Sequence, residues 1–188
     1  MKKKISQIIA FSVLAVVVLA IVLCAVIKLD YMPQMKLPEY PEVIQITDGE
    51  AGAITQSLTG DEYKTFVKKF NDSFKLSVLY SLFSGKLGKS ISSPKKVTSV
   101  TKGGYQVVFM FSSEQVLKDN GKEVTIANNS SETVKFTRLQ FYVQPEKGLN
   151  EDVTLYFYTD SSSYYAVTTM ANFDDLYNFI KEIPMFAD

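Results

Sequence analysis

The side chains of this chain that could carry out chemistry are its acids, serines and tyrosines. The sequence of 188 residues contains no histidine, which removes the commonest general base and metal ligand. Its single cysteine, Cys24, lies within an apolar run near the N-terminus. A Ser-His-Asp triad is therefore excluded, and so are thiol catalysis and thiolate zinc sites in the rest of the chain.

Paired carboxylates remain as candidate acid-base groups, because adjacent acids occur at Asp61–Glu62 and at Asp174–Asp175. Both pairs fall in the first turn of an expected helix, where the helix dipole favours negative charge by about 0.3–1 kcal/mol without any substrate. A Ser-x-x-Lys spacing around Pro94 lies in a Ser-rich loop, whereas such a pair needs a helical turn. We therefore predict no enzyme, with an envelope enzyme that uses carboxylates alone as the alternative.

No nucleotide-binding glycine motif and no calcium-loop spacing occur in the sequence. We therefore expect no cofactor, no metal and no catalytic residues. Nucleic-acid binding is also disfavoured, because no basic stripe interleaved with aromatic residues is present to contact phosphates.

Tyrosines on the late strands indicate a candidate binding surface. On the expected strand 153–159, apolar side chains alternate with Tyr156 and Tyr158, so these two tyrosines point to one face of the sheet. Tyr142 and one of Tyr164 or Tyr165 on neighbouring strands are expected on the same face, and Tyr164 is taken as the candidate. Tyrosine combines apolar area with a polar tip, so a tyrosine-rich face suits binding of a protein or a glycan. The alternative is that other elements cover this face and the tyrosines belong to the core.

The elements that must position these side chains are two helices and a set of strands. Apolar residues at helical spacing predict a helix from about residue 60 toward residue 84, opened by a capping box of Thr59 and Glu62. A second helix is expected from its cap, Asn172, to Pro184. Alternating patterns and turn pairs predict strands elsewhere, with hairpin turns at residues 103–104 and 120–121. Expected strands cover residues 43–46, 53–55, 97–101, 105–111, 115–117, 123–127, 134–143, 153–159 and 164–170.

Two passages of the sequence resemble each other without a gap, residues 53–70 and residues 166–183. Each reads as a strand, a cap, an acidic first turn and an amphipathic helix, so a duplicated hairpin-helix unit at 43–84 and 153–183 would explain the match. Convergence is the alternative, because helices that begin after a strand draw on the same few capping residues.

The N-terminal residues predict a membrane anchor. Residues 8–27 contain only one polar side chain, and a helix of that length reaches about 30 Å, the thickness of the hydrocarbon core. Three lysines precede this run, so the positive-inside rule places the N-terminus in the cytoplasm and the rest of the chain outside. A cleaved signal peptide and a lipoprotein are the alternatives, but no small-x-small cleavage site occurs, and Leu23 rather than a small residue precedes Cys24.

Prolines at positions 33, 38 and 41 predict an extended stalk between the anchor and the domain. Without the four lysines that flank the membrane run, 16 basic residues stand against 20 acidic ones, a net charge of about −4 for the outer part. An outer domain without cysteine, in a chain with one arginine, favours a bacterial cell envelope.

Together these features predict an α+β fold, in which an N-terminal transmembrane helix precedes a single antiparallel sheet with two helices packed on one face. The expected division is 1–28 for the basic tip and membrane helix, 29–42 for the stalk and 43–188 for the extracytoplasmic domain. The expected localisation is the cell membrane, with one pass through the bilayer at residues 8–27. We expect a non-catalytic binding or regulatory module that meets a protein or glycan of the envelope. A purely structural or assembly role is a further alternative.

Overall fold

A computed structural model describes residues 2–30, 40–48, 55–79, 91–97, 103–119, 121–126, 132–144, 151–158 and 164–186. The chain divides into two compact units, the first formed by Met1–Asp30 and Leu76–Gly88 and the second by Tyr31–Lys75 and Lys89–Asp188. The described residues 76–79 thus belong to the same unit as the N-terminal helix.

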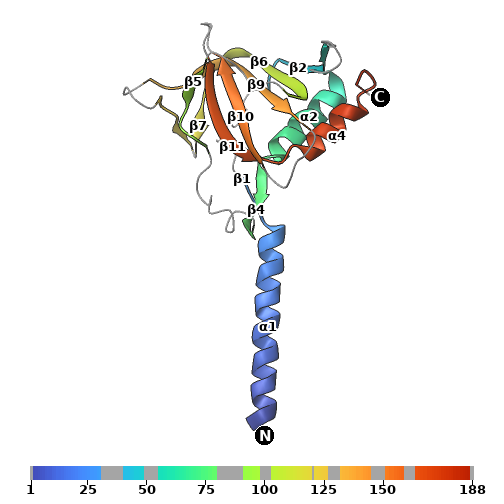
Figure 1. Cartoon of the computed structure of the whole chain (residues 1–188), viewed down its shortest axis with the longest axis vertical. Coiled ribbons are helices and arrows are strands. Elements are labelled where there is room, and N and C mark those ends of the chain that lie inside the picture. The colour runs from blue at the N-terminus through green and yellow to red at the C-terminus, as the bar shows by residue number, and fades with distance from the viewer. Residues whose placement is uncertain are drawn as a thin grey trace. The chain divides into compact units, whose positions relative to one another are not determined.

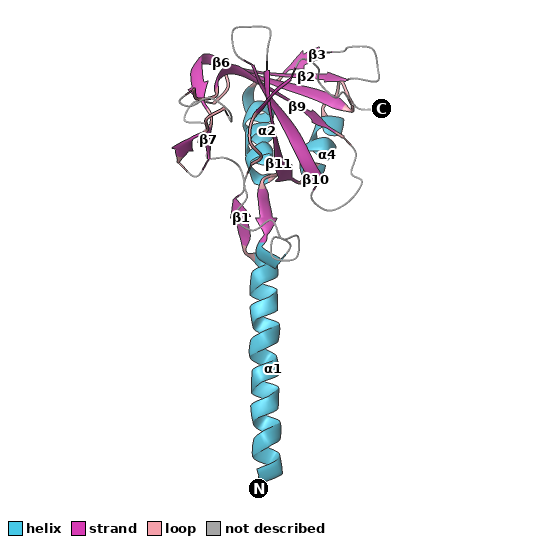
Figure 2. Cartoon of the chain, turned by 60° about the vertical axis from the view of Figure 1, so that its left-hand side comes forward, coloured by secondary structure: helices cyan, strands magenta, loops and turns pink. Residues whose placement is uncertain are grey.

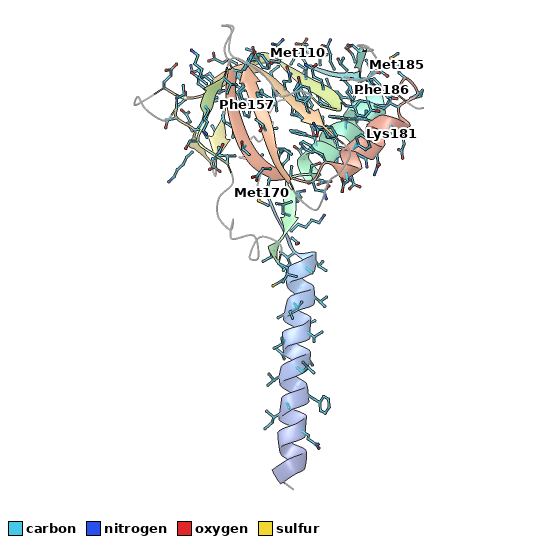
Figure 3. All side chains as sticks on the ribbon, in the orientation of Figure 1. Met110, Phe157, Met170, Lys181, Met185 and Phe186 are labelled. Carbon is cyan, nitrogen blue, oxygen red and sulfur yellow. The ribbon has the colours of Figure 1, made fainter. Side chains whose placement is uncertain are left out.

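The first unit is built on the helix α1 (Lys2–Val26), which ends where the apolar run gives way to Lys28. Its segment Ile9–Val26 has 18 residues and a mean hydropathy of 3.2, so it is long and apolar enough to be a membrane span or a signal sequence. No residue of this segment is buried. Figure 3 shows the side chains of α1 standing away from the helix on all sides. After α1, strand β1 (Lys28–Asp30) pairs with β4 (Lys75–Ser77), whose last two residues belong to this unit.

The second unit contains a seven-stranded antiparallel sheet in the order β3-β2-β6-β9-β10-β11-β5. The strands are β2 (Val43–Asp48), β3 (Thr55–Ser57), β5 (Lys95–Val97), β6 (Tyr105–Val116), β9 (Lys135–Val143), β10 (Glu151–Tyr158) and β11 (Tyr164–Ala171). The α+β class is therefore confirmed. The sheet is not single, because the described residues form two further small sheets, β1 with β4 and the hairpin of β7 (Lys118–Asp119) with β8 (Lys122–Glu123).

Two helices, α2 (Gly60–Asp72) and α4 (Asp174–Glu182), lie side by side against this sheet (Figure 1, Figure 2). The ring of Phe66 in α2 contacts the ring of Phe109 with centroids 6.1 Å apart, and Tyr177 in α4 contacts Tyr105 at 5.7 Å. Phe109 and Tyr105 alternate along β6 and point to the same face. The main core is therefore the aromatic layer between this face and the two helices.

The expected end of the first helix near residue 84 is wrong, because α2 ends at Asp72. The Ser73 hydroxyl donates a 2.8 Å hydrogen bond to the Lys69 carbonyl, while the Ser73 carbonyl accepts from the Asn172 amide at 2.8 Å. Phe74 then packs against Phe70 from outside the helix, with ring centroids 5.1 Å apart. Phe74 is buried, so the apolar period continues past Asp72 although α2 has ended.

The capping predictions have different outcomes at the two helices. Thr59 makes no side-chain cap hydrogen bond, and Gly60 begins α2 with a φ of 57°, so the predicted capping box is not formed. At α4 the N-cap position is held by Phe173, one residue later than predicted. Asn172 still caps the first amide of the helix, because its Oδ1 accepts a 2.9 Å hydrogen bond from the amide of Asp174.

The two glycine turns also differ. Gly121 has a φ of 78° and lies between β7 and β8, which confirms a tight hairpin at that point. Residues 98–101 of the strand expected before the turn at 103–104 lie outside the described residues. Among the described strands, β5 pairs with β11, whereas β6 pairs with β2 and β9. Gly104 instead permits the close approach of β9, because a Cβ atom at this position would lie 2.2 Å from the Val143 carbonyl oxygen.

The two similar passages adopt corresponding structures in their described parts. The hairpin β2–β3 precedes α2 and the hairpin β10–β11 precedes α4, and the two hairpins flank the central pair β6–β9 symmetrically in the sheet order. Phe66 and Phe179, which correspond in the sequence match, contact each other with ring centroids 6.3 Å apart. Residues 53 and 54 of the first passage lie outside the described residues, and duplication itself stays a prediction.

Most of the expected stalk, residues 31–39, lies outside the described residues. At its far end the Tyr63 hydroxyl donates a hydrogen bond to the Pro41 carbonyl, and the Glu42 amide donates to the Met110 carbonyl at 2.7 Å. These bonds attach residues 41 and 42 to the second unit.

Candidate functional site

The structure places all four predicted tyrosines on one face of the sheet. Tyr158 pairs with Tyr164 across β10 and β11, and Tyr156 lies two residues before Tyr158 on the same side of β10. Tyr142 on β9 alternates with Phe141, whose ring packs toward α2 and Phe173. The tyrosines therefore lie on the side of the sheet opposite the aromatic layer.

The four rings form two groups that share this face. The rings of Tyr158 and Tyr164 contact each other with centroids 4.5 Å apart, and Tyr156 lies 6.5 Å from Tyr164. Tyr142 joins them through Gln140, a residue that lies directly opposite Tyr156 in the sheet register. We call Arg138, Gln140, Tyr142, Tyr156, Tyr158 and Tyr164 the tyrosine face.

A chain of hydrogen bonds runs across the tyrosine face. The Tyr158 hydroxyl donates to Oε1 of Gln140 at 2.7 Å, and Nε2 of Gln140 donates to the Tyr142 hydroxyl at 2.8 Å. Gln140 is only 5% exposed, so both halves of its amide are satisfied by tyrosine hydroxyls rather than by bulk water. Tyr142 accepts in this chain, so the chain does not use its hydroxyl hydrogen.

Arg138 supplies a cation beside these hydroxyls. Its guanidinium carbon lies 4.0 Å from the centroid of the Tyr158 ring, a cation–π contact between residues that are opposite each other in the register. Arg138 is exposed, and within the described ranges no carboxylate forms an ion pair with it. Its N–H groups can therefore donate to a carboxylate, a carbonyl or a phosphate that reaches this face.

The hydroxyls of this chain stay protonated at neutral pH. Burial raises the pKa of Tyr142 above its ordinary value, although the hydrogen bond from Gln140 acts in the other direction. Burial also raises the pKa of Tyr158, and the neighbouring Arg138 charge opposes this shift. Protonated hydroxyls act as hydrogen-bond donors, so the face offers donors rather than a general base.

The four tyrosines are not equally accessible. Tyr156 is only 5% exposed and is a structural residue of this face, whereas Tyr142, Tyr158 and Tyr164 are half-buried. Of the two alternatives drawn from the sequence, burial as a structural residue therefore applies to Tyr156. Surface for a partner is offered by the other three tyrosines.

Sequence reasoning missed Gln140 and Arg138 as members of this group. Both alternate with Tyr142 on β9, so residues 138, 140 and 142 share a side of the strand. The period of two along β9, together with the presence of a single arginine in the chain, was a signal that could have identified them.

The adjacent acids lie at the helix starts, away from any acid cluster in the described structure. Asp61 has a fully exposed side chain, and its Oδ1 lies 3.7 Å from Nζ of Lys64 one turn along α2. Asp174 and Asp175 occupy the first turn of α4. Over the described ranges, no group of three or more His, Cys, Asp or Glu side chains comes together in a way that could hold a metal ion.

The chain matches no protein-family model, no curated protein and no solved structure. Its function must therefore be argued from the tyrosine face and the N-terminal helix, because the fold class alone does not indicate an activity.

Proposed function

We propose that the protein is a membrane-anchored, non-catalytic binding or regulatory module whose second unit lies outside the cytoplasm. In this proposal α1 spans the bilayer once, with Lys2, Lys3 and Lys4 on the cytoplasmic side. The bare apolar surface of α1 supports this role, since within a bilayer lipid would cover its side chains.

The observation that carries the binding role is the hydrogen-bonded chain on the tyrosine face. Tyr158, Gln140 and Tyr142 are held in fixed orientations by bonds of 2.7 and 2.8 Å, so little side-chain entropy is lost when a partner contacts them. Tyrosine and arginine are also the residues that most often dominate binding energy at interfaces. The proposed partner is a protein or glycan of the cell envelope that presents oxygen acceptors to Arg138 and Tyr142.

Crosslinking in whole cells of the native host tests this proposal. We expect wild-type protein to give a specific adduct that is lost in an Arg138→Gln/Tyr142→Phe variant, which removes the Arg138 charge and the Tyr142 hydroxyl but keeps most of the surface shape. Tyr40→Phe is the matched control, because Tyr40 is 67% exposed and lies outside the sheet. Equal adducts from all three proteins, or no adduct from any of them, would overturn the binding role and leave a structural role.

Membrane topology has its own test. Protease added to sealed cells is expected to digest the C-terminal region, and the intact mass of the purified protein is expected to include residues 1–27. A mature chain that begins well past Ile27 would show that α1 is a cleaved signal sequence.

A further inference from the structure

The C-terminal end of α1 is joined by a hydrogen bond to the segment that follows β4. The Ile27 amide donates to the Leu23 carbonyl at 2.9 Å and so continues the helical pattern by one residue. The Ile27 carbonyl then accepts from the Val78 amide at 3.0 Å, next to the pairing of β1 with β4. Ile27, β1 and Leu76–Val78 all belong to the first unit.

This bond satisfies a backbone group at a costly position. The last carbonyls of a helix have no partner within the helix, and an unpaired polar group in apolar surroundings costs several kcal/mol. Ile27 is the last residue of the apolar run and Lys28 follows it, so a spanning α1 leaves the hydrocarbon at this point. The Val78 amide therefore supplies a donor at the depth where water becomes scarce.

Three of the four residues 76–79 are apolar, and the fourth is Ser77. Leu76 is buried, whereas Val78 and Leu79 are half-buried and keep part of their side chains accessible. A backbone N–O distance of 3.0 Å to Ile27 leaves Val78 no freedom to lie far from the end of the span. Lys28 beside it is exposed and can extend its ammonium group to the headgroups.

We infer that Val78 and Leu79, the partly exposed apolar residues of this segment, form a second lipid-contacting element, which lies in the boundary between headgroups and acyl chains of the outer leaflet. This inference rests on the proposed membrane anchor. Lipid is the occupant because the segment is hydrogen-bonded to the end of α1, in which none of the residues Ile9–Val26 is buried by protein. In addition to α1, this element attaches the chain to the bilayer surface at a second point.

Tryptophan fluorescence of the full chain in phospholipid vesicles tests the inference, because the protein has no tryptophan of its own. Three single-tryptophan variants are compared: Val78→Trp for the proposed element, Val18→Trp for the middle of α1 and Met185→Trp for an exposed site in the second unit. Each is reconstituted in phosphatidylcholine whose acyl chains carry bromine near the glycerol or near the methyl end. Leu79→Trp repeats the measurement in case Val78→Trp disturbs folding.

Bromine near the glycerol end is expected to quench the emission of Val78→Trp most strongly. Bromine near the methyl end is expected to quench the emission of Val18→Trp most strongly. The emission of Met185→Trp is expected to be quenched by neither lipid. If Val18→Trp is quenched while Val78→Trp and Leu79→Trp behave like Met185→Trp, the second lipid contact is wrong and the anchor stands. If Val18→Trp is not quenched either, both the anchor and this inference fail. Equal quenching of Met185→Trp and Val78→Trp would also overturn the inference, because it would remove the specificity of the contact.

Discussion

The hydroxyl of Tyr158 and the side-chain amide of Gln140 are joined by a 2.7 Å hydrogen bond between β10 and β9, and the same amide continues to Tyr142 on β9. This contact links residues that lie 18 positions apart in the chain. It also explains why a glutamine that is 5% exposed is tolerated in the sheet.

Replacement of Gln140 by leucine is expected to lower the free energy of unfolding by about 1–3 kcal/mol, because two half-buried hydroxyls lose their partner. Urea denaturation of the full chain in detergent micelles, followed by circular dichroism, measures this change. Gln106→Leu is the matched control, since Gln106 is a half-buried glutamine on the same face, opposite Tyr142 in the register, and its side chain makes no hydrogen bond in the described structure. Equal losses in the two variants would show that the hydrogen-bonded chain does not stabilise the sheet.

Alkaline pH is expected to destabilise the protein through Tyr142 and Tyr158. Burial raises the pKa of both hydroxyls, and an unfolded tyrosine has a pKa of about 10. Above pH 10 the folded state therefore binds more protons than the unfolded state. The contribution of Tyr142 and Tyr158 to stability is fully present below pH 10 and is lost as the pH rises through their folded-state pKa values. Urea midpoints measured at increasing pH should fall less steeply for the Tyr142→Phe/Tyr158→Phe variant than for wild type. If the urea midpoints of the two proteins fall equally steeply with pH, the raised pKa values of Tyr142 and Tyr158 are contradicted.

Gly104→Ala is expected to destabilise the protein more than Gly60→Ala. Both glycines have a positive φ, which costs an alanine about 1–2 kcal/mol, but only at Gly104 would the new Cβ meet backbone, the Val143 carbonyl oxygen at 2.2 Å. Nothing lies within 4 Å of a Cβ at Gly60. Thermal unfolding of the two variants measures the difference, and equal melting temperatures would show that β9 can move away from residue 104.

Phe66→Ala is expected to lower the free energy of unfolding by about 3–5 kcal/mol, because Phe66 is fully buried and its ring contacts Phe109 and Phe179. Phe179→Ala should cost less, since Phe179 is half-buried. A double-mutant cycle of the two variants is expected to show a coupling of about 0.5–1.5 kcal/mol for the ring pair. Strictly additive losses would mean that the two corresponding helices do not stabilise each other through these rings.

The sequence by itself determined the features that depend on neighbours in the chain. The apolar run of α1, the cap formed by Asn172, the tight turn at Gly121 and the shared side of Tyr156 and Tyr158 all follow from local periodicity or local hydrogen bonding. These patterns operate over one or two turns of a helix or along one strand, so the residue types at fixed spacings are sufficient to predict them.

Only the tertiary structure decided the features that depend on distant partners. The end of α2 depends on Ser73 meeting Asn172, the place of β5 at the sheet edge depends on β11, and the chain through Gln140 depends on the register of β9 with β10. The pairing of β1 with β4 beside the end of α1 belongs to the same class. The physical reason is that backbone hydrogen bonding makes any two strands compatible, so the choice among pairings is made by the burial of side chains from the whole unit.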